Sequence, residues 1–142
     1  MKRFFGFFLF ASVAYAGDLP NPKLTPGVVN PAVTDVCSVK WGKDVRHVTL
    51  GMKQQVFASY GILWAQHSLY EVDHLISREL GGADDIRNLW PEHWASPWGA
   101  HEKDRLENKL HSLVCAGALP LPQAQKLIGG NWIAAYKKYI IP

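Results

Sequence analysis

The chain has 142 residues, about the size of one domain, and its 15 Lys and Arg against 12 Asp and Glu give a net charge of +3. Without Lys2 and Arg3 the balance is 13 against 12, so global charge barely supports nucleic-acid binding. Beyond the first residues no apolar stretch reaches the roughly 20 residues that a membrane span needs, which excludes an integral membrane protein.

The first 16 residues have the layout of a secretory signal peptide. Lys2 and Arg3 form a basic start, residues 4–13 are apolar, and Ala14-Tyr15-Ala16 is a small-x-small cleavage site. The alternative is a membrane anchor, but the apolar run has half the length of a spanning helix. We therefore expect cleavage after Ala16 and a periplasmic or secreted protein with no membrane span.

Prolines recur through residues 18–31, which forbids a regular helix or a central strand there. We expect residues 17–49 to form an extended arm and N-terminal segment, lying on the domain or hanging as a loose tail. Residues 50–142 form the domain that carries the function.

The chain has two cysteines, Cys37 and Cys115. In an exported protein the default expectation is a disulfide between them. Closing so long a loop stabilises a small domain by about 4.5 kcal/mol in the chain-entropy account. The alternative is metal ligation, which two isolated cysteines without a C-x-x-C pair disfavour.

Residues 50–60 predict a short helix that Gly61 ends, because apolar residues recur there at helical spacing. Residues 62–69 follow no clear period. Residues 70–76 favour a strand, and residues 78–88 a loop with a sharp bend at Gly81-Gly82. Leu89-Trp90-Pro91 predicts a second strand, which Pro91 must end or place at an edge.

A strong helix follows, with one apolar stripe and Gly117 as its C-cap; Ser96-Pro97 is a candidate start. Residues 123–128 fit a helical turn, and residues 131–139 fit a last helix. The chain is therefore predicted to be α+β: a small β-hairpin plus helix over about residues 69–117, with additional helices and the extended arm.

Asp73-His74 comes late in the first strand, and Asn88 opens the second. Phosphodiester hydrolysis needs a base to take a proton from water, and a neutral histidine is suited to that. It also needs the leaving oxygen stabilised, which a carboxylate-bound divalent ion can do. Neighbouring strand residues point to opposite faces, so the two side chains serve one phosphate only where the strand ends or bends.

The central segment resembles the HNH endonuclease family, which has the ββα-metal fold. The resemblance lies in Glu71-Val72-Asp73-His74-Leu75-Ile76, then Glu79-Leu80-Gly81-Gly82, then Asn88-Leu89-Trp90-Pro91. It extends from about Pro22 to Tyr136 and is closest to an exported bacterial and phage branch. It implies a metal-dependent endonuclease acting on DNA, and as an option on RNA, with Mg²⁺ as the first expectation and Mn²⁺ or Zn²⁺ as alternatives.

By this resemblance Asp73 is a metal ligand, His74 is the general base, and Asn88 fixes the loop and orients the imidazole. The plain alternatives are a buried core histidine and an ordinary turn asparagine. His101 is the best-placed candidate for a second metal ligand near the start of the helix. In a helix unbroken from Pro97 it would instead point away from the apolar stripe, as an exposed polar residue.

Two further sets of residues flank the expected site. Glu79 is a second-tier candidate, as a metal ligand or as a partner of His74, and it could equally be a solvated loop carboxylate. The cations expected to meet phosphates are Arg78, Arg87, Lys103 and Arg105, with ordinary ion pairing as their alternative. Trp94 and Trp98 favour the core but lie in a loop that could face the substrate.

Two other functional classes stay open. One is a catalytically inactive nucleic-acid-binding module, and the other is a small envelope protein stapled by its disulfide. Nothing in the sequence specifies base recognition, an oligomeric state or a partner beyond nucleic acid.

Overall fold

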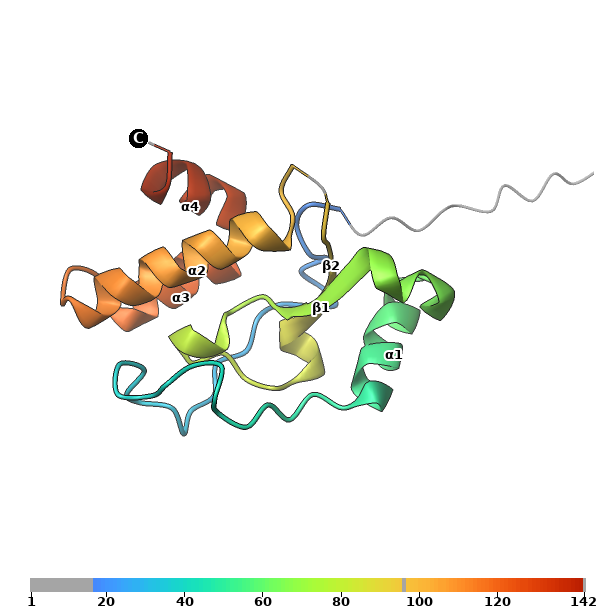
Figure 1. The fold of residues 1–142 in the computed structure, drawn as a ribbon, viewed down its shortest axis with the longest axis horizontal. Coiled ribbons are helices and arrows are strands. Elements are labelled where there is room, and N and C mark those ends of the chain that lie inside the picture. Colours follow the sequence, from blue (N-terminus) through green and yellow to red (C-terminus); the bar gives the residue numbers. More distant parts are fainter. Residues whose placement is uncertain (1–16, 96, 142) are drawn as a thin grey trace, which may run out of the picture.

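The computed structural model describes residues 17–95 and 97–141, and the expected signal peptide over residues 1–16 lies outside them. The fold is α+β, as predicted, with several helices around one two-stranded hairpin (Figure 1). In chain order the elements are α1 (Leu50–Ser59), η1 (Trp64–Leu69), β1 (Tyr70–His74), η2 (Arg78–Leu80), η3 (Ile86–Asn88), β2 (Leu89–His93), α2 (Ala100–Cys115), α3 (Leu121–Gly129) and α4 (Trp132–Tyr139).

The hairpin pairs β1 and β2 antiparallel, from Tyr70 opposite His93 to His74 opposite Leu89. The first strand ends at His74, two residues earlier than its apolar pattern suggested. The second continues past Pro91, which the sequence analysis allowed only as a strand end or an edge position. Pro91 is tolerated because in a two-stranded sheet each strand has an edge at which no N–H is needed for pairing.

The helix ends follow local capping chemistry. Thr49 caps α1, its side chain accepting from the Met52 N–H, and Gly61 follows the helix at φ 67°. The central helix α2 begins at Ala100, later than the Ser96-Pro97 start, with Gly99 as its N-cap. The helical turn expected at residues 123–128 is a full helix, α3.

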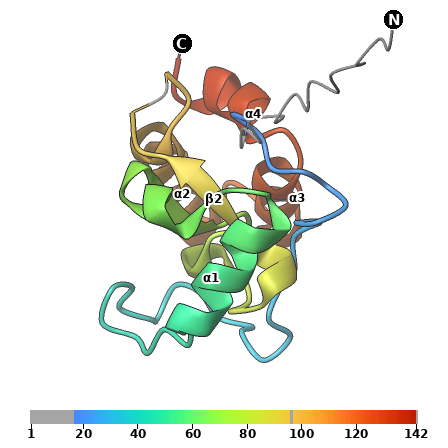
Figure 2. The same ribbon diagram turned by 90° about the vertical axis from the view of Figure 1, so that its right-hand side faces the viewer.

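Two apolar clusters lie on opposite sides of the hairpin, and Figures 1 and 2 show α1 at one end of the molecule and α2, α3 and α4 at the other. Phe57 of α1 is central to the smaller cluster, which covers Tyr70, Val72 and Leu89. The larger cluster joins the loop after β1 to α2, α3 and α4, and its members include Trp90, Trp132, Leu80, Leu106, Leu110 and Ile128.

The N-terminal arm lies on the domain. Thr25 is buried and donates to the Leu89 carbonyl at 2.9 Å, and Val29 forms an isolated bridge with Gly82. Glycine is required at that bridge, because a Cβ on Gly82 would lie 1.7 Å from the Ile76 oxygen. The arm therefore fixes the loop between the two strands.

The predicted disulfide is present and joins Cys37 of the arm to Cys115 at the end of α2. It closes a loop of 78 positions and attaches the middle of the arm to the domain. Within the described residues, no helix is both long and apolar enough to cross a membrane.

Candidate active site

A pocket of about 190 Å³ lies beside β1, between the hairpin and α2. It brings Asp73 and His74 together although they are neighbours on a strand, because β1 ends at His74 and both side chains reach the same opening. The pocket is lined by four carboxylates, two guanidiniums, an imidazole and a hydroxyl: Glu71, Asp73, Asp104, Glu107, Arg46, Arg78, His74 and Ser77.

His74 is 4% exposed, and its Nε2 lies 2.7 Å from Asp84 Oδ1. Burial lowers the pKa of His74 below its ordinary value, although the nearby Asp73 and Asp84 carboxylates oppose that shift. The imidazole is therefore neutral at pH 7. Because an ionised carboxylate only accepts, Nε2 carries the proton and Nδ1 keeps the lone pair that a general base needs.

Asp84 has a defined role that the sequence did not reveal. Its Oδ2 accepts from the backbone N–H of His47 at 2.6 Å, while its Oδ1 faces His74 and lies 3.5 Å from Arg78 Nε. Burial raises the pKa of Asp84, but these hydrogen bonds lower it further than burial raises it. An ionised, fixed carboxylate thus sets the tautomer and orientation of the imidazole.

Asn88 is fully buried and spans the loop between the strands. Its Oδ1 accepts from the Ile76 N–H at 3.0 Å and from the Val28 N–H at 3.3 Å. Its Nδ2 donates to the carbonyls of Ile76 and Ala83, each at 3.0 Å. The side chain fixes the loop that follows His74 and ties it to the arm.

Lys103 is buried beneath the pocket and does not face solvent. Its Nζ donates to Asp73 Oδ2 at 2.8 Å, to the His74 carbonyl at 2.7 Å and to Glu107 Oε1. Burial disfavours the ammonium, but the surrounding carboxylates raise the pKa of Lys103 above its ordinary value. The sequence-based expectation of a direct phosphate contact does not fit this position, because the charge is already enclosed by protein acceptors.

The acids around Lys103 do not all carry charge. Burial and the neighbouring Asp73 charge raise the pKa of Glu92 to about 10, so Glu92 is protonated. Burial likewise raises the pKa of Glu107 to about 8. Burial also raises the pKa of Asp73, but Lys103 lowers it more, so Asp73 stays ionised. The network thus holds one fixed negative charge at Asp73.

The donor set at the pocket fits a hard cation. Carboxylate oxygens are what Mg²⁺ prefers, and it takes one or two of them while keeping waters. Among the described residues, the group of three close potential ligands is Cys37, His111 and Cys115, whose thiols are joined in the disulfide. The pocket therefore fits a largely hydrated Mg²⁺ better than a zinc ion with three protein ligands.

His101 is not brought to Asp73. It is exposed, does not line the pocket, and its ring lies 6.1 Å from the ring of Trp94. On α2 the residues that face β1 are Lys103 and Glu107, and His101 precedes Lys103 by two positions, about 200° around the helix. His101 is therefore exposed although α2 begins at Ala100 and not at Pro97, because its position around the helix turns it away from β1.

Of the expected substrate cations, Arg78 alone lines the pocket with a guanidinium, held by Asp44 and the Val45 carbonyl. Arg87 is exposed and pairs with Asp85, and Arg105 lies over the Tyr136 ring. The second guanidinium of the pocket belongs to Arg46, which donates to the Val72 carbonyl at 2.9 Å. No local signal marks Arg46, since it lies in the arm, far from the motif.

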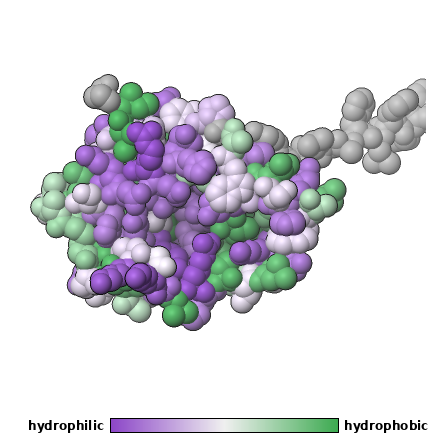
Figure 3. All heavy atoms as spheres, in the orientation of Figure 1, coloured by the Kyte–Doolittle hydropathy of each residue, from purple (hydrophilic) through white to green (hydrophobic). Residues whose placement is uncertain are grey.

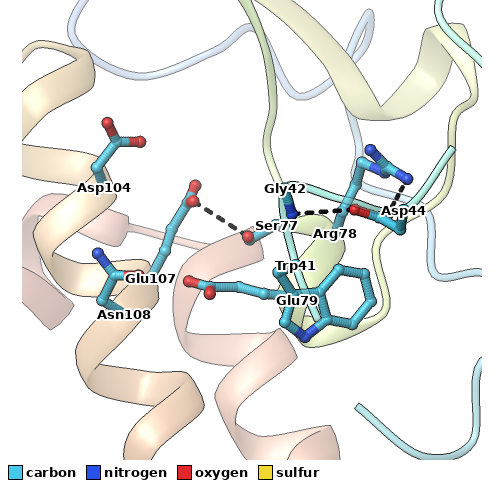
Figure 4. A pocket seen from close by; sticks show the side chains of 9 residues that line it. All are labelled: Trp41, Gly42, Asp44, Ser77, Arg78, Glu79, Asp104, Glu107 and Asn108. Carbon is cyan, nitrogen blue, oxygen red and sulfur yellow. Dashed lines mark hydrogen bonds and ion pairs between the residues drawn. The ribbon is translucent and has the colours of Figure 1, made fainter. Parts of the chain in front are cut away.

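Glu79 lines a neighbouring pocket of about 260 Å³, which shares Ser77, Arg78, Asp104 and Glu107 with the first. Figure 4 shows its side chain extending from the loop toward Glu107 and Asn108. Its Oε1 is buried without a hydrogen-bond partner, and burial raises the pKa of the carboxyl. Hydrophilic residues cover much of this face of the molecule (Figure 3).

Comparison of the chain with family models, with curated proteins and with solved structures found no match.

Proposed function

We propose that the chain is an exported, metal-dependent HNH-type endonuclease that hydrolyses phosphodiester bonds in DNA, with RNA as an alternative substrate. One observation carries the proposal. A neutral imidazole, oriented by a carboxylate, opens into the same pocket as an ionised Asp73 and two arginines. That is the set of groups that water attack on a phosphodiester requires.

The imidazole supplies the base. Nδ1 of His74 accepts a proton from water as the water attacks phosphorus, and the Asp84 carboxylate stabilises the imidazolium that forms. Because Asp84 is held by the His47 N–H and lies near Arg78, it needs no rearrangement when the charge develops.

The remaining groups of the pocket each neutralise a different part of the phosphate charge. Arg46 and Arg78 bind the non-bridging oxygens. A divalent cation, when bound at Asp73 and a neighbouring carboxylate, supplies stabilisation of the departing 3′-oxygen. Lys103 and the protonated Glu92 keep Asp73 ionised and fixed for that task.

Two observations support export. The first 16 residues have the signal-peptide layout, and the described chain contains an intramolecular disulfide, which persists in oxidising compartments. Periplasm and medium both satisfy this chemistry.

The test is a cleavage assay on the mature chain. Supercoiled plasmid and a labelled single-stranded oligonucleotide are incubated with Mg²⁺ or Mn²⁺, and with EDTA. We expect cleavage that needs the cation and falls by about 10²- to 10⁴-fold in His74→Ala. Asp73→Asn is preferred to Asp73→Ala, because alanine would leave Lys103 buried without its counter-ion.

Asp85→Asn is the matched control, since Asp85 pairs with Arg87 outside the pocket. Thermal melting of every variant separates lost chemistry from lost folding. Undiminished cleavage by His74→Ala would refute the assignment of the base.

The second candidate is a nucleic-acid-binding module without catalysis. The Lys103–Asp73 pair favours it, because the ammonium already occupies one oxygen of the expected metal ligand, and His101 does not complete the site. Binding of the oligonucleotide without cleavage under any cation would support this candidate over the nuclease.

A further inference from the structure

A further pocket, of about 250 Å³, lies between η1 and α1 beside the start of β1. Aromatic rings and two cations line it: Trp64, His67, Tyr70, Trp94, Arg46 and Lys53. Its volume is below the range of about 300–1,000 Å³ usual for drug-sized ligands, so it suits a group of one or two rings.

The rings are held in place by the buried Phe57. Phe57 makes edge contacts with Trp64 at 5.1 Å and with Tyr70 at 5.7 Å between ring centroids. The His67 ring stacks on Trp64 at 4.8 Å, and its Nδ1 lies 2.9 Å from the Trp64 carbonyl. The pocket is therefore formed before any ligand enters, which lowers the cost of ordering on binding.

Several large apolar side chains around η1 are exposed to solvent. No residue of η1 is buried, and Leu63, Leu69 and Trp94 are 71%, 53% and 39% exposed. Clustered exposure of this kind around a ring-lined pocket is typical of a binding surface.

This aromatic pocket adjoins the candidate active site. Arg46 and Glu71 line both pockets. Tyr70 at one end of β1 belongs to the aromatic pocket, and His74 at the other end belongs to the active-site pocket, about 13 Å apart at the rise of a strand. A polymer held at His74 therefore passes the aromatic pocket.

We infer that this aromatic pocket binds an unpaired nucleobase of the same strand whose phosphate lies in the Asp73–His74 pocket. The inference rests on the proposed nuclease function and adds its substrate class, single-stranded nucleic acid. Aromatic faces stack on any base, while Arg46 and Lys53 meet the flanking phosphates. A base within a duplex is stacked between its neighbours and cannot enter such a pocket without being unstacked.

The test compares one labelled oligonucleotide as a single strand and as a duplex. Trp94→Ala is the main variant because Trp94 is partly exposed and outside both apolar clusters, and Lys53→Ala is the second. We expect Trp94→Ala to raise KM for the single strand by roughly 5- to 150-fold, the range for loss of one base stack, with kcat little changed. Lys126→Ala removes the same charge from α3 and should leave KM unchanged.

A binding measurement keeps the inference independent of activity. In a His74→Ala background, titration with a short single-stranded oligonucleotide should quench tryptophan fluorescence, and Trp94→Ala should reduce that quenching while preserving the melting temperature. Binding with quenching but no cleavage by wild type would overturn the nuclease and keep the base pocket. Cleavage of single strand and duplex with equal kcat/KM, unchanged in Trp94→Ala, would overturn the base pocket and keep the nuclease.

Discussion

The two faces of the hairpin are buried by different chemistry. Toward α1, Tyr70, Val72 and Leu89 belong to an apolar cluster around Phe57. Toward α2, Asp73 meets the ammonium of Lys103, which is 0% exposed. A strand alternates its side chains, so one short hairpin can bury an apolar cluster on one side and, on the other, a charged network beside the larger apolar cluster.

The two faces should respond differently to substitution. An apolar cluster loses stability in proportion to the contacts removed, whereas a buried ion pair loses most when one partner is left alone. The charged face also explains how Asp73 is fixed beside the candidate base.

Lys103→Met should have the largest effect. It leaves the half-buried Asp73 without its counter-ion, so the free energy of unfolding should fall by about 3–5 kcal/mol. Val72→Ala on the other face should lose about 2 kcal/mol. Urea unfolding followed by circular dichroism measures both.

A double variant sharpens this comparison. Adding Asp73→Asn to Lys103→Met removes the unpaired charge and should recover part of the lost stability. If the losses in free energy of unfolding of Lys103→Met and Asp73→Asn simply add in the double variant, the charged face behaves like ordinary packing, and the proposed difference between the two faces is wrong.

The disulfide fixes α2, the helix that bears Lys103, to the arm. Replacing Cys37 and Cys115 by serine should lower the free energy of unfolding by about 2–5 kcal/mol, because the unfolded chain is released from a long loop. The shift of the urea midpoint measures it. A thiol assay on the oxidised wild-type protein is the control, and two reactive thiols would contradict the bond.

Glu92→Gln should make the charged face less sensitive to pH. The pKa of Glu92 is raised from 4.5 to about 10, so the folded state keeps a proton that the unfolded state releases above pH 4.5. Its stabilising contribution is present below that pH and is lost as pH rises toward 10. Between these two pH values, the free energy of unfolding of the variant should therefore rise relative to that of wild type by up to about 1.4 kcal/mol per pH unit.

Stability curves at several pH values measure this gain. Glutamine keeps the shape of the side chain and stays neutral at every pH, so packing is preserved while the titration is removed. A difference between variant and wild type that does not change with pH would show that Glu92 is not protonated in the folded protein.

Asp84→Asn tests the orientation of the base, with Asp85→Asn as its neighbour and control. Loss of the carboxylate should lower kcat/KM for cleavage by about 10- to 100-fold, as for other groups that orient a functional histidine. The Asp84 hydrogen bond raises the pKa of His74, so its loss should move the acidic limb of the pH–rate profile to lower pH. An equal loss in both variants would point to general damage of the loop.

Much of the fold could be predicted because it rests on local signals. Apolar periodicity located α1, the hairpin and α2, and cysteine usage located the disulfide. The helix η1 was not predicted, because it buries no residue and so leaves no apolar period. An apolar period marks only elements that pack against the core, and η1 faces the solvent.

The candidate site was predictable only in part, for a related reason. Asp73, His74 and Asn88 are adjacent to the strand ends that their motif marks. The partners that fix them come from elsewhere: Asp84 from within the loop and Arg46 from the arm. Lys103 was expected at the surface, and its burial depends on three acceptors that meet only in the folded chain.

His101→Ala should have the smallest effect and decides the remaining ligand question. Because its side chain is exposed and outside the pocket, stability should change by less than about 0.5 kcal/mol. The Mg²⁺ concentration that gives half-maximal cleavage should also stay the same, and a Mg²⁺ titration of kcat measures it. A shift of about 10-fold or more in that concentration, with folding intact, would make His101 a ligand and require the first turn of α2 to move toward the hairpin.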